Sequence, residues 1–239
     1  MEIKDKLKQQ YPYRIELHAH TSPVSACSQI TPKEMIETYR SFNYDGIVIT
    51  NHFSPDFLSR YPKEEIIDRY LADFYETKEI GAKEGIKVYL GAEVRFTENH
   101  NDYLIYGANE EIIKKVYEYI DKGLEIFRKE VLLPDSLLIQ AHPNRDGMTK
   151  ISPDLLDGME ILNLHPGHNS RNPFTERIVR DNPHLIPTAG TDYHHSGRGH
   201  EAISALRSQY LPEDSFGIAD ILKSRDYLFE VVGNTIIIP

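Results

Sequence analysis

Short apolar runs alternate along the chain with longer stretches in which apolar residues recur at helical spacing. The short runs predict β-strands, because they are brief and are bounded by turn-forming residues. They cover residues 13–17, 46–50, 86–91, 103–106, 137–141, 159–164 and 185–189. A last apolar run, residues 227–238, is interrupted by Gly233 and Asn234 and predicts a terminal hairpin.

Three of the intervening stretches predict amphipathic helices. Residues 31–42 begin with Thr31 as N-cap and Glu34 three positions later, which is the pattern of a capping box. Residues 62–85 place aromatic and aliphatic side chains on one helical face and stop at a glycine. Residues 109–130 carry the apolar stripe of a half-buried helix.

The alternation of strands and helices predicts a parallel sheet, because parallel strands need a crossover that a helix commonly supplies. About seven strands in a chain of 239 residues favour a barrel or a barrel-like arrangement. We therefore predict an α/β fold in which residues 1–239 form a single domain. A doubly wound open sheet is the alternative that the pattern leaves open.

Composition narrows the class of protein. Hydrophobic residues make up 40% of the chain and charged residues 27%, as in an ordinary soluble globular domain. Cys27 is the single cysteine, which excludes an intrachain disulfide and a cysteine-rich zinc site. No apolar run approaches the ~18 residues of a membrane span, and the N-terminal segment lacks the apolar core of a signal peptide, so we expect a cytoplasmic protein. The net charge of −10 argues against binding to duplex nucleic acid, which needs a basic surface.

Side chains that commonly bind metals occur where the predicted strands end. In a parallel α/β barrel the reactive groups lie at the carboxyl ends of the strands. Imidazole and carboxylate groups are frequent ligands of divalent transition metals. The residues at these strand ends are His18, His20, His52, Glu93, His142, Asp192 and His194.

The spacing of His18 and His20 has a geometric consequence. In an extended chain residues i and i+2 point to the same side, so both imidazoles can face one cavity. Asp192 and His194 share this spacing, and the first and last strands of a closed barrel are neighbours. A single His-x-His pair is weak evidence, because surface histidines often produce it. Recurrence of such residues at five strand ends indicates a multinuclear metal centre.

The ordered motifs resemble those of the PHP (polymerase and histidinol phosphatase) superfamily of metal-dependent phosphoesterases. The resemblance runs from ELHAHT to GTDYHH and includes DGIVITNH, GAEVRF and LIQAHPNR. It implies a distorted seven-stranded (β/α) barrel that holds two or three divalent metal ions, commonly zinc, manganese or iron. It also implies hydrolysis of a phosphate ester.

The resemblance further implies how the ligands are shared. The first metal site would have the ligands His18, His20, Glu93 and Asp192. Glu93 would bridge to a second metal, which His142 also binds. His52 and His194 would bind a third metal.

The sequence departs from the family pattern at two positions. After the first histidine pair many relatives carry an aspartate or a histidine, and Cys27 stands nearest to that position here. A thiolate can bind zinc, and a small buried cysteine is the alternative interpretation. Before the fourth strand relatives often have a histidine, where this chain offers Asp102, with His100 close by. We assign Asp102 as the ligand.

Phosphate ester hydrolysis suggests roles for further residues. A bridged metal pair activates a bound water and neutralises phosphoryl charge, so Glu93 and Asp192 are predicted to be catalytic. Arginine matches phosphate oxygens with its planar fork, and Arg145, Arg171 and Arg198 follow predicted strands. Arg145 is the first choice, because it trails a predicted ligand by three residues.

Histidines near the same strand ends are candidates for contact with the substrate. His165 is expected to line the substrate pocket, and His194, His195 or His168 would donate a proton to the leaving oxygen. The expected substrate is a small phosphorylated metabolite, a nucleotide or a short single-stranded oligonucleotide. Two alternatives stay open: an amidohydrolase-type hydrolase, which also begins with His-x-His, and a non-catalytic metal-binding member of the family.

Overall fold

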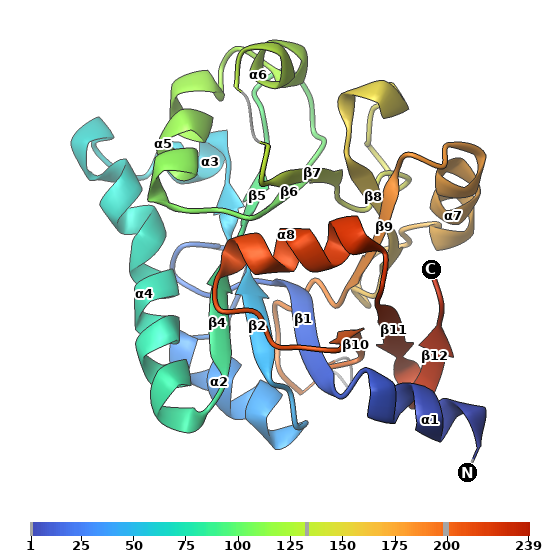
Figure 1. Ribbon diagram of the computed structural model, residues 1–239. Helices are drawn as coiled ribbons and strands as arrows, with labels where there is room; N and C mark the ends of the chain where they lie inside the picture. The colour runs from blue at the N-terminus through green and yellow to red at the C-terminus, as the bar shows by residue number, and fades with distance from the viewer. Residues whose placement is uncertain (1, 132–133, 198–200) are drawn as a thin grey trace.

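The strands form two six-stranded sheets in the computed structural model, which describes residues 2–131, 134–197 and 201–239 (Figure 1). Across the first sheet lie, in order, β12 (Thr235–Ile237), β11 (Leu228–Val231), β10 (Ser204–Ser208), β1 (Tyr13–Ala19), β2 (Gly46–Ile49) and β4 (Lys87–Leu90). Across the second lie β3 (His52–Phe53), β5 (Ala92–Val94), β6 (Tyr103–Tyr106), β7 (Leu137–Gln140), β8 (Gly158–Asn163) and β9 (Ile186–Gly190). The protein therefore has a mixed α/β fold, and the predicted terminal hairpin is present as β11 and β12.

Helices connect and cover these strands. They are α1 (Ile3–Gln10), α2 (Pro32–Ser41), α3 (Pro55–Leu58), α4 (Ile66–Glu84), α5 (Glu110–Tyr119), α6 (Leu124–Glu130), α7 (Asn172–Asp181) and α8 (Ser215–Ser224). The predicted capping box of α2 is confirmed, because Thr31 and Glu34 each bond the other's backbone N–H. The predicted helix over residues 109–130 is two helices, because Gly123 has a φ of 83° and interrupts it.

The predicted distorted seven-stranded barrel is not confirmed: the described residues form two separate sheets and no closed barrel. The predicted strands 46–50 and 86–91 are present as β2 and β4, and each is followed by a short strand that was not predicted: β3 after Asn51 and β5 after Gly91. β2 pairs with β4 in one sheet, and β3 pairs with β5 in the other. On the other side, β1 pairs antiparallel with β10, and a lone bridge joins Ala19 to Tyr193.

The direction of β6 also differs from the predicted parallel arrangement. β6 runs antiparallel to β5 and to β7, and Tyr103 pairs with Val94 and with Gln140. A parallel connection needs a crossover of about a dozen residues or more, and the segment between β5 and β6 contains no helix. Asp102, which directly precedes β6, therefore lies beside the ends of β5 and β7.

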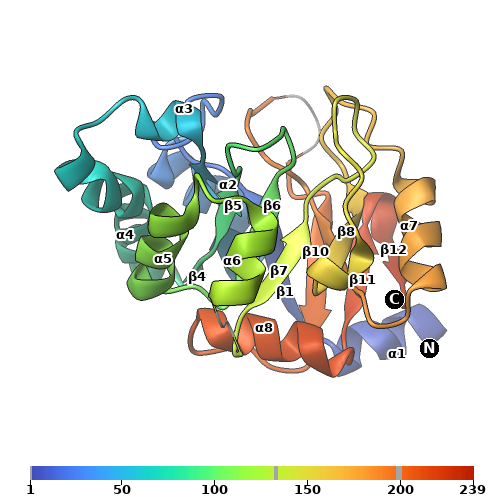
Figure 2. The ribbon, with the colours of Figure 1, turned by 90° about the horizontal axis from the view of Figure 1, so that it is seen from above.

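The buried apolar side chains form two clusters. One cluster of buried side chains lies between the sheets and joins Leu17 and Leu104 to Ile218 and Leu222 of α8. Figure 2 shows α8 across one end of the strands, with the long loops at the other end. A second cluster packs α2, α4, α5 and α6 against the outer faces of the strands. Among the described residues, no helix has the length and apolar character needed to cross a membrane.

Candidate metal centre

His18 and His20 lie at the end of β1, and both side chains are fully buried. Glu160 Oε1 lies 2.8 Å from Nδ1 of His18, and Ser25 Oγ lies 3.2 Å from Nδ1 of His20. The Nε2 atoms of both rings are buried and have no hydrogen-bond partner among the described residues. Since a buried polar atom without a partner costs free energy, both nitrogens call for a further partner.

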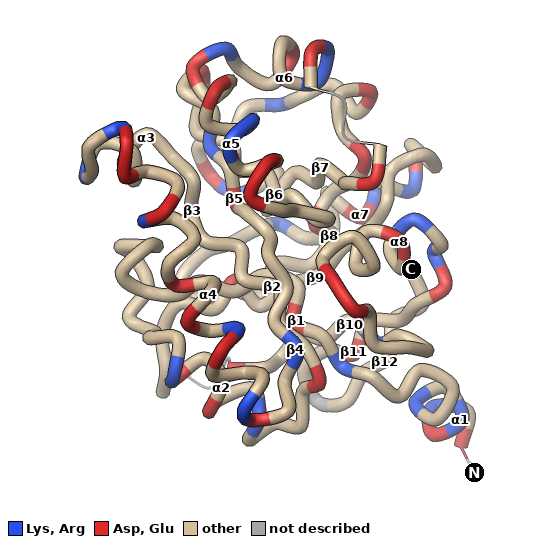
Figure 3. Tube along the Cα trace, turned by 60° about the vertical axis from the view of Figure 1, so that its left-hand side comes forward, with Lys and Arg blue, Asp and Glu red and all other residues tan. Residues whose placement is uncertain are grey.

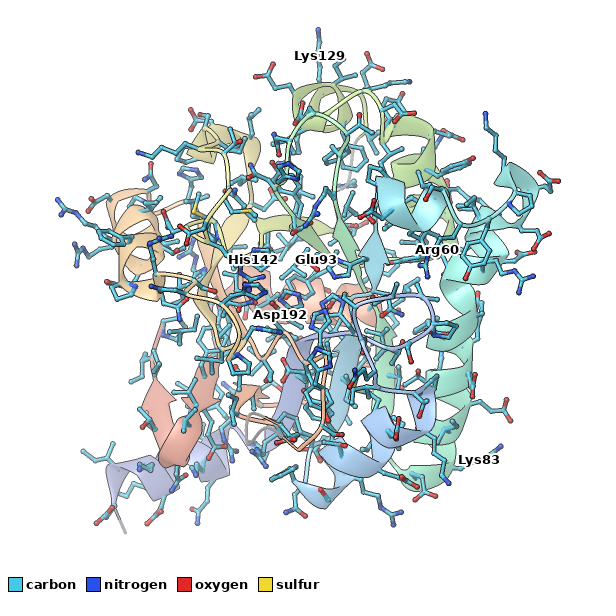
Figure 4. All side chains as sticks on the ribbon, turned by 180° about the vertical axis from the view of Figure 1, so that it is seen from behind. Arg60, Lys83, Glu93, Lys129, His142 and Asp192 are labelled. Carbon is cyan, nitrogen blue, oxygen red and sulfur yellow. The ribbon has the colours of Figure 1, made fainter. Side chains whose placement is uncertain are left out.

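Two carboxylates face these nitrogens. Glu93 Oε1 lies 3.3 Å from His18 Nε2, and Glu93 Oε2 lies 3.4 Å from His20 Nε2. Asp192 Oδ1 lies 3.6 and 3.4 Å from the same two nitrogens. Ligand atoms around a tetrahedral zinc ion are about 3.4 Å apart, given metal–ligand bonds of about 2.0–2.1 Å. The four side chains therefore have the spacing of ligands around one divalent ion, and Figure 4 shows Glu93 and Asp192 in the middle of the site.

A second group of side chains shares Glu93. His142 Nε2 lies 3.0 Å from Glu93 Oε1 and 3.8 Å from Asp102 Oδ2. Asp102 is also held by Arg95, whose Nε and Nη2 atoms donate to the two carboxylate oxygens at 2.8 and 2.6 Å. Asp102 thus reaches the centre as predicted, but a guanidinium competes for its oxygens. The neighbouring His100 lines the same cavity.

A third group lies on the side of His20. Candidate ligand atoms of His20, His52 and His194 all lie within 4.8 Å of one another. His52 Nδ1 also lies 2.8 Å from Glu93 Oε2. Cys27 lines the same cavity as His52 and His194, and its side chain is exposed. All seven side chains predicted from the strand ends therefore come together, and their role as ligands stays a prediction.

The charged groups of the centre shift one another's pKa values. Burial opposes ionisation of Glu93, but the imidazoles of His52 and His18 hold its pKa well below the usual range. Burial also opposes ionisation of Asp192, but His18 and His194 hold its pKa well below the usual range. The pKa of His20 is lowered well below its ordinary value by burial and then by His194 and His52. Burial opposes protonation of His18, His52 and His194, but neighbouring carboxylates raise the pKa of each ring, that of His194 to about 9. Because ionised carboxylates and neutral imidazoles are the states that coordinate metal ions, these three rings would release their protons when a metal binds.

Two of these residues have an unusual backbone. His142 has a φ of 30° and Asp192 a φ of 54°, in the left-handed region that most side chains avoid. Such conformations cost about 1–3 kcal/mol each and persist where the surroundings impose them. Gly190 makes a close approach there, because a Cβ at this position would lie 2.3 Å from the Cβ of His18.

Arg145 reaches the centre from the loop after β7. Its Nη2 atom donates to Asn163 Oδ1 and to Asp192 Oδ2, both at 2.8 Å. Asn163 donates to the same Asp192 oxygen at 3.1 Å. Arg145 therefore lines the cavity, as expected of a phosphate ligand, but part of its guanidinium orients a predicted metal ligand.

Sequence reasoning missed Glu160 and Asn163, which lie on β8. Glu160 contacts His18 Nδ1 and accepts the backbone N–H of His142 through Oε2 at 3.0 Å. Asn163 donates to Glu160 Oε2 at 3.0 Å, so both residues connect predicted ligands. The sequence did contain a signal, because Glu160 stands inside the apolar run GMEIL. Charged residues are rarely buried without a partner, so a glutamate in such a run indicates a buried partner.

The remaining predicted residues take different positions. His165, His168 and His195 line the cavity. Burial, followed by His194 and other nearby cationic groups, lowers the pKa of His165 to about 4 although Asp192 acts in the opposite direction. Arg171 donates to the Asn144 carbonyl and to Asp146, and it is not among the described residues that line the cavity. Arg198 lies outside the described residues.

The cavity above the centre is large enough for a metabolite. Its volume is about 960 Å³. Besides the predicted ligands, three arginines line it, namely Arg60, Arg95 and Arg145. Binding pockets for small molecules commonly measure about 300–1,000 Å³. The cavity therefore joins a cluster of metal-binding side chains to walls that carry three arginines and the carboxylates of Asp56 and Asp146.

Comparison with known proteins agrees with this arrangement. The PHP domain family model matches residues 16–167, which include His18, His20, His52, Glu93 and His142. No curated protein matches the chain. A two-domain protein from Bacteroides vulgatus ATCC 8482, said to contain a predicted PHP-like metal-dependent phosphoesterase, is 16% identical with a TM-score of 0.58. The alignment covers 91% of this chain, which spans 64% of that one, and at this identity the likeness shows the fold alone.

Two further solved structures are similar at 14% identity. One, from Bifidobacterium adolescentis ATCC 15703, is provisionally described as a metal-dependent phosphoesterase, with a TM-score of 0.48 over 77% of this chain and 89% of that chain. The other is an amidohydrolase from Chromobacterium violaceum with bound sulfate and no metal, with a TM-score of 0.44 over 77% and 88%. The family model covers more than half of the sequence and includes five of the seven residues predicted from the strand ends. The chain therefore belongs to the PHP domain family.

Proposed function

We propose that the protein is a metal-dependent phosphatase or phosphodiesterase. The observation that carries this proposal is the set of four distances, 3.3–3.6 Å, between the Nε2 atoms of His18 and His20 and the carboxylates of Glu93 and Asp192. Side chains so spaced, with buried nitrogens that lack other partners, suit a divalent ion. The proposed substrate is a small phosphorylated metabolite, a nucleotide or a short single-stranded oligonucleotide.

The donor set fits two or three ions of zinc, manganese or iron. Glu93 lies between the side chains near His18 and those near His142 and His52, so it suits a bridging role. Divalent ions at these positions would supply an activated water and neutralise charge on the phosphoryl oxygens. Arg145 and Asn163 hold Oδ2 of Asp192. They thereby direct Oδ1 towards His18 and His20.

The cavity walls suit a phosphorylated substrate. Arg145 carries a guanidinium whose planar fork matches phosphate oxygens, and Arg60 and Arg95 add positive charge to the same cavity. His165, whose pKa is about 4, is neutral at pH 7 and can accept or donate a hydrogen bond to the substrate without adding charge. These residues bind and orient the ester above the metal ligands.

The leaving oxygen needs a proton donor. Burial, followed by Arg145, lowers the pKa of His168, so less of this ring is in the protonated form at neutral pH. His195 lines the cavity with its ring centroid 6.1 Å from that of His194. His194 and His195 are therefore the two proposed donors, and only His195 lies outside the predicted ligand set.

The surface charge supports a small substrate over duplex nucleic acid. The chain has a net charge of −10, and in Figure 3 the Lys and Arg positions are interspersed with Asp and Glu on α2, α4 and α6. Binding to a duplex relies on a basic surface that displaces counterions. A cytoplasmic location stays a prediction from the sequence.

Activity assays on metal-analysed protein test the proposal. The metal-stripped chain should be reloaded with zinc, manganese or iron(II) and assayed with p-nitrophenyl phosphate, its diester analogue, nucleotides and short single-stranded oligonucleotides. We expect metal-dependent release of phosphate or nucleotide that Glu93→Gln abolishes and exposed Glu118→Gln leaves unchanged. Turnover of a cyclic amide alone would favour the amidohydrolase alternative, and metal binding without any turnover would favour a non-catalytic role.

A further inference from the structure

A buried serine contacts His20 at the ring nitrogen that does not face the carboxylates. Ser25 lies in the loop between β1 and α2, and both residues are fully buried. Ser25 Oγ lies 3.2 Å from Nδ1 of His20, and it accepts the backbone N–H of His52 at 3.0 Å. Whether Oγ or Nδ1 donates the proton between them decides which nitrogen of His20 keeps a lone pair. The other partners of Ser25 determine the direction of this hydrogen bond.

Asn51, between β2 and β3, fixes the proton of Ser25. The backbone N–H of Thr21 donates to Oδ1 of Asn51 at 2.7 Å, and Nδ2 of the same amide donates to Thr21 Oγ1 at 2.8 Å. Because a backbone N–H can only donate, Oδ1 and not Nδ2 must face it, so the orientation of the amide is fixed. Ser25 Oγ lies 3.0 Å from this Oδ1, which can only accept. Ser25 therefore donates its single proton to Asn51.

Thr21 continues this chain of hydrogen bonds to α4. Its Oγ1 accepts from Asn51 and donates to Oδ2 of Asp73 at 3.2 Å. The same carboxylate oxygen accepts the backbone N–H of Val24 at 3.0 Å, which ties the loop to the helix. Thr21, Asn51 and Asp73 are all buried. A buried network in which the members satisfy one another is rigid, so the donors and acceptors keep one direction from the imidazole to α4.

We propose that Ser25 and Asn51 are positioning residues that hold the proton of His20 on Nδ1, so that Nε2 is the atom that binds a metal ion. Ser25 has given its own proton to Asn51, so its oxygen accepts from His20. Nε2 of His20 has no hydrogen-bond partner among the described residues, and it faces Glu93 and Asp192. Loss of the partner that holds the second nitrogen of a ligating histidine commonly weakens metal binding about 10–100-fold. This inference rests on the proposed function in that it concerns a predicted ligand of the same centre.

NMR of the zinc-loaded full chain tests the proposal without an activity assay. With zinc on Nε2 of His20, a proton on Nδ1 that is bonded to Ser25 should exchange slowly with water and give a resolved signal coupled to the ring nitrogen. We expect this signal in the wild type and its loss in Ser25→Ala, whose affinity for zinc should fall about 10–100-fold. Ser28→Ala is the matched control and should keep the signal. This serine of the same loop is also buried, but it bonds the carbonyl oxygens of His20 and His194 instead of a ring.

The wild-type spectrum decides the proposal even where Ser25→Ala does not fold. Zinc bound through Nδ1 of His20 overturns it, and so does an Nδ1 proton that exchanges as fast as that of the exposed His184. Unchanged zinc affinity in a folded Ser25→Ala overturns it as well. The proposed function is judged separately. The signal and the loss of affinity without ester hydrolysis keep Ser25 as a positioning residue and reject the phosphoesterase, and hydrolysis without them does the reverse.

Discussion

Arg145 donates from Nη2 to Oδ2 of Asp192 at 2.8 Å, and the other oxygen of that carboxylate, Oδ1, faces the histidines of β1. The two oxygens of Asp192 thus have separate partners. Because the arginine holds one oxygen, the carboxylate has little freedom to rotate away from the metal position. Such outer partners fix the orientation of ligands and influence metal affinity.

Arg145→Lys should therefore weaken metal binding as well as substrate binding. Arginine contacts Asp192 and Asn163 with its planar fork and has further donors for the cavity. Lysine keeps the positive charge but lacks this fork. We expect the affinity for one metal ion to fall about 10–100-fold, together with a higher KM for phosphate esters. Metal titration and steady-state kinetics measure the two effects. Arg177→Lys on the exposed face of α7 is the matched control, and unchanged metal affinity in Arg145→Lys would limit this residue to substrate binding.

Removing a central carboxylate should remove metal while the fold survives. Glu93→Ala takes away the proposed bridge and should abolish metal-dependent hydrolysis, and Asp192→Asn should lose one metal equivalent. Elemental analysis after gel filtration gives the metal content, and circular dichroism reports the fold. Retained activity with unchanged metal content in Glu93→Ala would contradict the bridging role.

The site was more predictable from the sequence than the sheet topology was. The pair at His18 and His20 and the pair at Asp192 and His194 follow from apolar runs and from the i, i+2 geometry of a strand. Their proximity is confirmed, since the backbone N–H of His20 donates to the carbonyl oxygen of Tyr193 at 3.0 Å. The reason differs from the predicted one, because a single bridge from Ala19 of β1 to Tyr193, not a closed barrel, brings them together.

The features that the sequence did not predict depend on pairing between residues far apart in the chain. Gly91 ends a predicted strand, but no local signal shows that the residues before and after it join different sheets. Asp102 precedes β6, and only the antiparallel direction of that strand brings it to the centre. Glu160 was visible as a charged residue in an apolar run, but its partner, His18, lies 142 positions away.

Glu160 should act as a positioning residue for His18. Its carboxylate accepts from Nδ1 of His18, which leaves Nε2 of the neutral ring free to bind a metal. In Glu160→Gln the neutral amide accepts from Nδ1 more weakly than the carboxylate does, so we expect metal affinity to fall about 10–100-fold and kcat to fall with it. Glu176→Gln on the surface of α7 is the control. The pH profile separates this role from simple packing, because the variant should shift the acidic limb of metal binding.

A second carboxylate, far from the centre, should make stability depend on pH. Glu230 on β11 is contacted by Lys8 at 2.5 Å, Arg14 at 3.2 Å and Arg207 at 2.7 Å, and 11% of its side chain is exposed. Burial opposes its ionisation, but the hydrogen bonds from Lys8 and Arg207 lower its pKa below the ordinary value of 4.5. The folded protein therefore binds this proton less tightly than the unfolded chain does.

It follows that the stabilisation by Glu230 is fully present above pH 4.5 and is lost as the pH falls through the lower pKa of the folded state. Glu230→Gln should reduce the free energy of unfolding by about 1–3 kcal/mol at pH 7, because three cations lose a charged partner. Urea unfolding of both proteins between pH 7 and acid conditions measures the difference, which should shrink as the pH falls below 4.5. Glu79→Gln, in the exposed pair with Lys83 on α4, should change nothing measurable. A difference that stays constant across this range would mean that the charge of Glu230 does not stabilise the fold.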